Sequence, residues 1–242
     1  MTAPVFLADD LAGDRVVLTG PEGHHAATVR RVRVGEAVDL VDGRGTRASC
    51  RVASVARDVV ELTVVRRTVE PTPSPRVVLV QAIAKGDRGE LAVELATEVG
   101  VDEIVPWSAE RSIVKWEGER GERALRRWRS TAREAGKQSR RAWLPQVLDP
   151  HTTAQLAALI PAASAVLVLH EGTTAPLALV DLPPAGDVLL VVGPEGGVTD
   201  DELAILTAAG AQAVRLGSSV LRTSTAGAAA ASVVSALTSR WR

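Results

Sequence analysis

The stretch DVLLVVGPEGGVTDDELAILTAAGAQAVRLGSSVLRTSTAGAAAA, residues 187–231, decides the fold. It opens with Asp187–Val192, a run of Val and Leu without polar alternation, which is typical of a parallel strand buried on both faces. Three glycines follow within the five residues Gly193–Gly197, where the backbone can turn sharply or approach a ligand closely. Thr199 and Glu202 then stand at the spacing of a capping box and predict a helix over 200–209.

A second apolar segment, 213–216, predicts another strand, which leads through Gly217 into an Ala-rich helix reaching about residue 239. Glycine turns after two neighbouring parallel strands are expected to meet at the carboxyl edge of the sheet, where open α/β sheets bind ligands. The turn Gly193–Gly197 matches neither of the common nucleotide-binding glycine patterns, and Asp200 and Asp201 would repel a phosphate. A ligand without phosphates is therefore favoured.

The same alternation of strand and helix begins earlier in the chain. Apolar runs predict strands over 76–83, 104–106 and 165–169, with a helix over 89–99 between the first two. This order indicates a mainly parallel, doubly wound α/β sheet.

GPEGG followed by LGSSVLRTSTA resembles the paired C-terminal motifs of the SPOUT (α/β-knot) methyltransferases, and most closely the family that methylates N3 of a uridine in 16S ribosomal RNA. The resemblance extends over nearly the whole chain, including LATEVGV (95–101) and SAERSIVK (108–115). It implies a deep trefoil knot, a homodimer and S-adenosylmethionine as the cofactor. It also implies cofactor contacts on three turns: Leu169, His170, Gly193, Pro194, Glu195, Gly196, Gly197, Leu216, Gly217, Val220, Leu221, Thr223 and Thr225.

The composition limits where such a protein could work. The chain has 242 residues, a net charge of −1 and one cysteine, Cys50, which fits a reducing compartment. The first ten residues show no signal-peptide pattern, and no run approaches the roughly 18 apolar residues that span a membrane. We expect a cytoplasmic protein without a membrane partner.

The first 70 residues differ in pattern from the rest. Alternating Val and polar residues predict short strands over 15–18, 37–41, 46–53 and 59–65, with a hairpin turn at 42–45. We interpret them as a small β-barrel, and the resemblance implies a PUA-like RNA-binding domain. The Pro-rich segment 71–75 is the predicted linker to a SPOUT domain over 76–242.

Basic residues are concentrated in one segment. Between Arg111 and Arg141 there are eleven Lys or Arg against four Glu, whereas residues 142–242 hold four basic and eight acidic residues. Such segregation favours a polyanion-binding face, although a solvated helix with paired charges would look the same. A second basic group follows His24, on a short helix predicted over 24–33. These basic groups, together with the resemblance to the family, imply RNA contacts at His25, Arg30, Arg31, Arg33, Arg111, Lys115, Gln138, Arg140 and Arg141. The alternatives are a merely solubilising surface and, for Gln138, capping of the following loop.

Methylation at N3 of uridine requires loss of a proton or stabilisation of the anion that develops on the base. Arg222, directly after the second glycine turn, is our candidate catalytic residue, and its alternative use is to bridge acids or carbonyls. The resembled family has Glu where this chain has Ser224 and often Lys where it has Leu95, so a carboxylate base at 224 is not expected. No metal is needed, and the adjacent His24 and His25 lack further ligands at metal-site spacing.

The sequence is also compatible with two other functions: a SPOUT methyltransferase for another RNA site, and a non-catalytic RNA-binding protein.

Overall fold

The computed structural model describes residues 3–241, and the chain forms two compact units. The first unit reaches to Thr72 and also contains Gly136–Leu144, while the second comprises Pro73–Ala135 and the chain from Pro145 onward. The boundary at Thr72 lies within the Pro-rich segment. The sequence pattern predicts Gly136–Leu144 in the second domain, whereas the structure places this segment in the first unit. The backbone explains the difference, because Gly45 N donates to Ala142 O at 3.0 Å and Leu144 N to Gly43 O at 3.0 Å.

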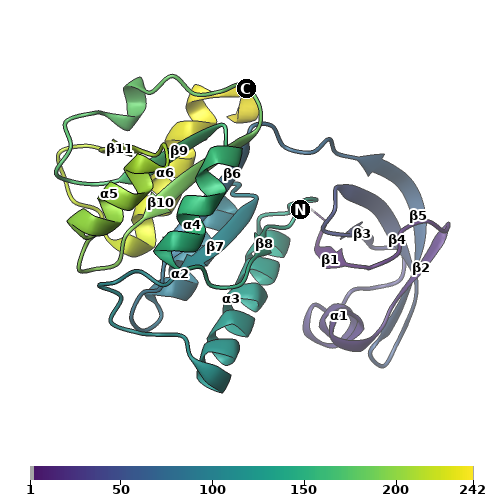
Figure 1. Cartoon of the computed structure of the whole chain (residues 1–242). Helices are drawn as coiled ribbons and strands as arrows, with labels where there is room; N and C mark the ends of the chain where they lie inside the picture. The colour runs from purple at the N-terminus through teal and green to yellow at the C-terminus, as the bar shows by residue number, and fades with distance from the viewer. Residues whose placement is uncertain (1–2, 242) are drawn as a thin grey trace. The chain divides into compact units, whose positions relative to one another are not determined.

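The first unit is a five-stranded sheet that curls on itself, as expected of a PUA-like domain (Figure 1). Its strands, in the spatial order β1-β3-β4-β5-β2, are β1 (Val5–Leu7), β3 (Ala37–Val41), β4 (Thr46–Ala56), β5 (Val59–Val69) and β2 (Arg15–Leu18). The predicted hairpin between β3 and β4 is confirmed, with Val41 paired to Arg47. Strand β1 was not predicted, because three apolar residues show no period of their own. Alternate side chains, among them Phe6, Leu40 and Leu62, fill the interior.

The helix predicted over 24–33 begins and ends earlier. The structure has α1 (Gly20–His24) followed by a π-helical turn, His25–Val29. Pro21 lies in the first turn of α1, where its missing N–H costs nothing. Arg31 has φ +55°, so Arg31 and Arg33 lie beyond the end of the helical segment.

The second unit contains a six-stranded parallel sheet, which confirms the predicted α/β class. Its spatial order is β11 (Gln212–Val214), β9 (Ala165–Leu169), β10 (Asp187–Val192), β6 (Arg76–Ala82), β7 (Glu103–Trp107) and β8 (Gln146–Val147). Its helices are α2 (Arg88–Glu98), α4 (Thr153–Leu159), α5 (Asp200–Ala208) and α6 (Thr223–Leu237), with 3-10 turns at Ile160–Ala162, Leu177–Leu179 and Ser239–Trp241. Helix α3 (Gly118–Gln138) belongs to this unit as far as Ala135, and its last residues belong to the first unit.

Helices cover both faces of this sheet (Figure 1), because both sets of alternating side chains are apolar. Val77 and Leu79 of β6 pack in one cluster with side chains of α2, α3 and α6. Val78 and Val80 point the other way, into a cluster that includes Leu156 of α4 and Leu206 of α5. None of the helices within residues 3–241 has the length and apolarity to cross a membrane.

Candidate functional site

A cavity of about 760 Å³ opens at the carboxyl edge of the six-stranded sheet. It is lined mainly by segments at the carboxyl ends of three strands: Leu169–Glu171 at the end of β9, Gly193–Val198 after β10 and Arg215–Thr223 after β11. The two glycine turns therefore meet, but the expectation that their strands are neighbours was wrong. Strand β9 lies between β10 and β11. The order of parallel strands is set by packing over long sequence distances, which local patterns do not contain.

The first glycine turn is held by a hydrogen bond within it and by another from Arg111. Gly197 N donates to Pro194 O at 2.9 Å, and Gly197 has φ +75°, a conformation that favours glycine. Arg111 donates from Nη1 to Gly196 O at 3.0 Å. A Cβ on Gly196 would lie 3.1 Å from Cβ of Arg111, so the two segments are in close contact. Arg111, predicted for RNA, thus lies at this cavity and braces its turn.

The segment carrying Arg111 is fixed by the capping box at the start of α5, which the structure confirms at Thr199 and Glu202. Glu202 is 3% exposed, and its Oε1 accepts from Glu110 N at 2.9 Å and from Thr153 Oγ1 at 2.9 Å. Lys115, also predicted for RNA, donates from Nζ to Ala109 O at 2.8 Å. These bonds give the first turn a rigid support.

Glu195 pins the same turn from its other side. Its Oε1 accepts from Lys85 N at 3.3 Å and from Arg88 Nη1 at 3.1 Å. Burial alone would raise the pKa of Glu195. Hydrogen bonds from its own N–H, from Lys85 N and from Arg88, with the Arg88 charge, outweigh that and hold the pKa below its usual value.

Glu195→Gln should therefore lower stability at neutral pH by less than about 1 kcal/mol, since Arg88 is partly exposed. A lowered folded-state pKa contributes stability that is present above the ordinary value of 4.5 and is lost as pH falls through the folded-state pKa. Melting temperatures measured between pH 3.5 and 7 test this: the difference between wild type and variant should shrink as the pH is lowered. A difference that stays constant over this range would contradict the ionic role. Glu119→Gln is the control, because the Glu119 side chain is 88% exposed on α3.

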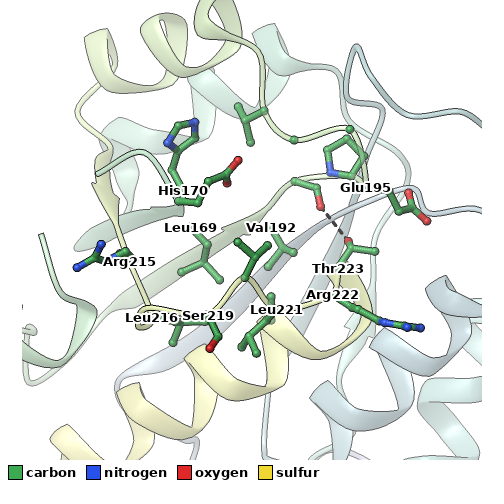
Figure 2. A pocket seen from close by; sticks show the side chains of 18 of the residues that line it. Leu169, His170, Val192, Glu195, Arg215, Leu216, Ser219, Leu221, Arg222 and Thr223 are labelled. Carbon is green, nitrogen blue, oxygen red and sulfur yellow. Dashed lines mark hydrogen bonds between the residues drawn. The ribbon is translucent and has the colours of Figure 1, made fainter. Parts of the chain in front are cut away.

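A hydrogen bond connects the first glycine turn to the end of the second. Thr223 Oγ1 donates to Gly193 O at 2.8 Å, as the dashed line in Figure 2 shows. Thr223 is the first residue of α6, directly after the second turn. Thr225, predicted as a cofactor contact, is not among the cavity's lining residues. Its Oγ1 instead donates to Arg222 O at 3.2 Å, within the first turn of α6.

Apolar side chains form the middle of the cavity. Leu169, Val192, Leu216 and Leu221 lie together there (Figure 2). Arg222 lies at the rim, and its side chain extends away from this apolar group (Figure 2). Ser224, by contrast, is 4% exposed and lies behind the rim in α6.

All the predicted cofactor contacts except Thr225 line the cavity, together with several residues that sequence reasoning missed. The missed residues are Arg88, Glu171, Val192, Val198, Asp200, Arg215, Ser218, Ser219 and Ala226. Most extend a predicted turn by one or two positions, so a wider window on each turn would have found them. No sequence pattern pointed to Arg88. It follows β6, and no residue of β6 lines the cavity. Within residues 3–241, no cluster of three His, Cys, Asp or Glu side chains could hold a metal ion.

The remaining residues predicted for RNA all belong to the first unit, and they differ in exposure. Arg30, Arg31, Arg33 and Gln138 are exposed. His25 and Arg140 have internal contacts: His25 packs edge-on against Phe6 at 5.5 Å, and Arg140 donates from Nη2 to Ala3 O at 2.6 Å. Arg141 is half-buried.

Comparison of this chain with known protein families and structures agrees with this geometry. Residues 70–235 match the family model described as RNA methyltransferase domain, and residues 18–65 match the RNA methyltransferase PUA domain. The chain is 48% identical to Ribosomal RNA small subunit methyltransferase E of Mycobacterium bovis, over 100% of this chain and 94% of the relative. The protein of the same name from Bacillus subtilis is 34% identical, over 90% of this chain and 88% of the relative.

A solved structure described as Ribosomal RNA small subunit methyltransferase E from Neisseria gonorrhoeae bound to S-adenosyl methionine has a TM-score of 0.87 and 30% identity, covering 98% of each chain. The fold and the family models together place this chain in the class of RNA methyltransferases with a PUA domain. Within that class, the chain belongs to the family whose curated members carry the name Ribosomal RNA small subunit methyltransferase E.

Proposed function

We propose that this protein transfers a methyl group from S-adenosylmethionine to N3 of one uridine in 16S ribosomal RNA of the small ribosomal subunit. The observation that carries the proposal is the meeting of both glycine turns around one cavity, joined through Thr223 and Gly193. The names of the relatives support the substrate class, and the ligand of the Neisseria gonorrhoeae structure supports the cofactor. The choice of uridine N3 rests on the motif resemblance.

The lining of the cavity fits such a cofactor. Its apolar middle suits the flat face of a nucleobase, while the backbone groups of the glycine turns are available to polar edges. Gly217 has open space where a Cβ would lie, so a ligand can approach the backbone there. The acidic residue Asp200 lines the wall, and its carboxylate is compatible with a cationic sulfonium.

The bound cofactor would supply an electrophilic methyl group, and the residues of the chain would supply position and charge. The Arg222 guanidinium at the rim would stabilise the negative charge that develops on the uridine as N3 loses its proton. Ser224 is uncharged and buried, so position 224 holds no carboxylate base. Glu195 is a weak base, because its pKa lies below the usual value and its Oε1 already accepts two hydrogen bonds.

We also propose that the chain has the trefoil knot and forms the homodimer that the resemblance implies. Its proposed cytoplasmic location follows from the substrate. The small side chains of α6, such as Ala228 and Ala229, would allow close approach of a second copy. Light scattering of the purified protein at several concentrations measures the mass directly. A monomer mass throughout would contradict the dimer.

The exposed arginines of the first unit are the proposed phosphate contacts. Arg30→Gln combined with Arg33→Gln should weaken RNA binding and reduce the slope of log affinity against log salt by about one for each phosphate that is no longer neutralised. Binding of a 16S fragment at several salt concentrations tests this. Arg57→Gln is the matched control, since its side chain is 97% exposed on the β4–β5 hairpin. An unchanged slope in the double variant would mean that these arginines only aid solubility.

The function itself is tested with small subunits from a strain that lacks this protein. Purified protein and S-adenosylmethionine are expected to restore one methyl group, which mass spectrometry of RNA fragments would map to N3 of a uridine. Methylation at a ribose or at another base would reject the assigned product.

A further inference from the structure

Gln81 is a polar residue in an otherwise apolar part of the sheet. It lies in β6, paired with Val192 of β10 on one side and Pro106 of β7 on the other. The side chain is 0% exposed, and it shares the sheet face of Val77 and Leu79 that α6 covers. Burying an amide costs free energy unless its groups are bonded, so its presence here needs a reason.

The amide nitrogen of Gln81 reaches the bond that joins the two glycine turns. Nε2 donates to Thr223 Oγ1 at 3.0 Å and to Ala82 O at 3.2 Å. The single hydroxyl hydrogen of Thr223 is already donated to Gly193 O at 2.8 Å. Thr223 Oγ1 can therefore only accept from Gln81, which fixes the direction of the chain from Gln81 through Thr223 to Gly193.

The same geometry fixes the orientation of the amide. Turning it over would place Oε1 against a hydroxyl whose hydrogen is committed and against the Ala82 carbonyl. In the observed orientation Oε1 is buried and has no hydrogen-bond partner among the described residues. An unpaired buried acceptor is a cost to stability, so the amide is not explained by stability alone.

Resting on the proposed function, we propose that Gln81 is a positioning residue for the methyl donor, although it does not line the cavity. It acts through Thr223: the amide holds the hydroxyl oriented toward Gly193 O and so sets the separation of the two turns between which the donor lies. Its loss should weaken donor binding without weakening the fold. A purely structural residue would show the reverse.

The experiment is a calorimetric titration of the full-length protein with S-adenosylmethionine, together with melting temperatures. Gln81→Leu keeps the approximate volume and removes both donors. We expect its dissociation constant to rise about tenfold, the worth of one buried hydrogen bond, with a melting temperature equal to or above that of wild type. Thr223→Val should show a similar loss of affinity, and Thr223→Ser should restore most of it.

The coupling between Gln81 and Thr223 is tested by combining Gln81→Leu with Thr223→Val. Because both act on one bond chain, the double variant should bind no more weakly than the weaker single variant. Thr238→Val is the matched control: Thr238 and Thr223 are each 7% exposed, but Thr238 donates to Val234 O at the other end of α6. The affinity of Thr238→Val for S-adenosylmethionine should stay within twofold of the wild-type affinity.

The outcomes separate the two proposals. No binding by wild type would reject the proposed function and this inference with it. Wild-type binding with equal affinity in Gln81→Leu, additive losses in the double variant, or a fall in melting temperature without a loss of affinity would each overturn the inference alone.

Discussion

Arg222→Ala is expected to slow methyl transfer by about a hundredfold to a thousandfold, while the dissociation constant of S-adenosylmethionine changes by no more than a few-fold. The reason is the position of the Arg222 side chain. Arg222 is exposed at the rim of the cavity, and its side chain extends away from the apolar residues that would hold the donor. A charge placed there acts on the base that arrives, and removal of charge stabilisation for a developing anion lowers the turnover number more than ground-state binding.

Single-turnover methylation of small subunits, with calorimetry for the cofactor, separates the two effects. Arg222→Lys keeps a positive charge without the planar fork and should recover part of the rate. Arg57→Ala, on an exposed hairpin of the first unit, is the control for removal of an arginine and should leave the turnover number unchanged. Normal turnover in Arg222→Ala would remove the catalytic assignment, and a large loss of cofactor affinity would reassign Arg222 to the donor.

Lys137→Met is expected to lower the free energy of unfolding of the first unit by about 3 to 5 kcal/mol. Lys137 Nζ lies 2.9 Å from Glu22 Oε1, and the two side chains are 6% and 13% exposed. Glu22 also accepts from Leu7 N at 3.2 Å, so it cannot turn away to solvent without breaking this bond to β1. Methionine keeps the apolar stem of the lysine but takes the ammonium charge away from a buried carboxylate.

Urea unfolding, monitored through hydrogen exchange at the backbone amides of β3 and β4, measures the stability of the first unit. Glu22→Gln added to Lys137→Met should recover most of the stability, because the carboxylate charge is then removed as well. Arg123→Met is the matched control. It breaks an ion pair with Glu119 whose side chains are 62% and 88% exposed, so a change below about 0.5 kcal/mol is expected. If Lys137→Met unfolded at the wild-type urea concentration, the segment Gly136–Leu144 would not be holding the first unit together.

The features that the sequence could predict are the local ones. The run Asp187–Val192 is a strand with the predicted bounds, because unbroken Val and Leu leave few other solutions. The capping box at Thr199 and Glu202 was likewise predictable, since its two side chains bond within four residues of one another. Glycine at positions that require a turn, such as Gly197 with φ +75°, gave the location of the cavity.

The features that the sequence could not predict all depend on distant partners. The placement of β9 between β10 and β11 follows from sheet packing, and the membership of Gly136–Leu144 in the first unit follows from bonds to Gly43 and Gly45. Arg111 was counted among the basic residues of an RNA-binding segment. Its contact with Gly196 O joins positions 85 residues apart. Gln81 gave no signal, because one polar residue in an apolar strand has no period of its own.

The most direct test of the central claim is a crystal structure of this protein with S-adenosylmethionine. We predict electron density for the donor between the segments Leu169–Glu171, Gly193–Gly197 and Leu216–Leu221, with its methyl group facing the side of the cavity that bears Arg222. Full occupancy of the donor at any other place on the chain, with these segments in contact with solvent only, would contradict the account.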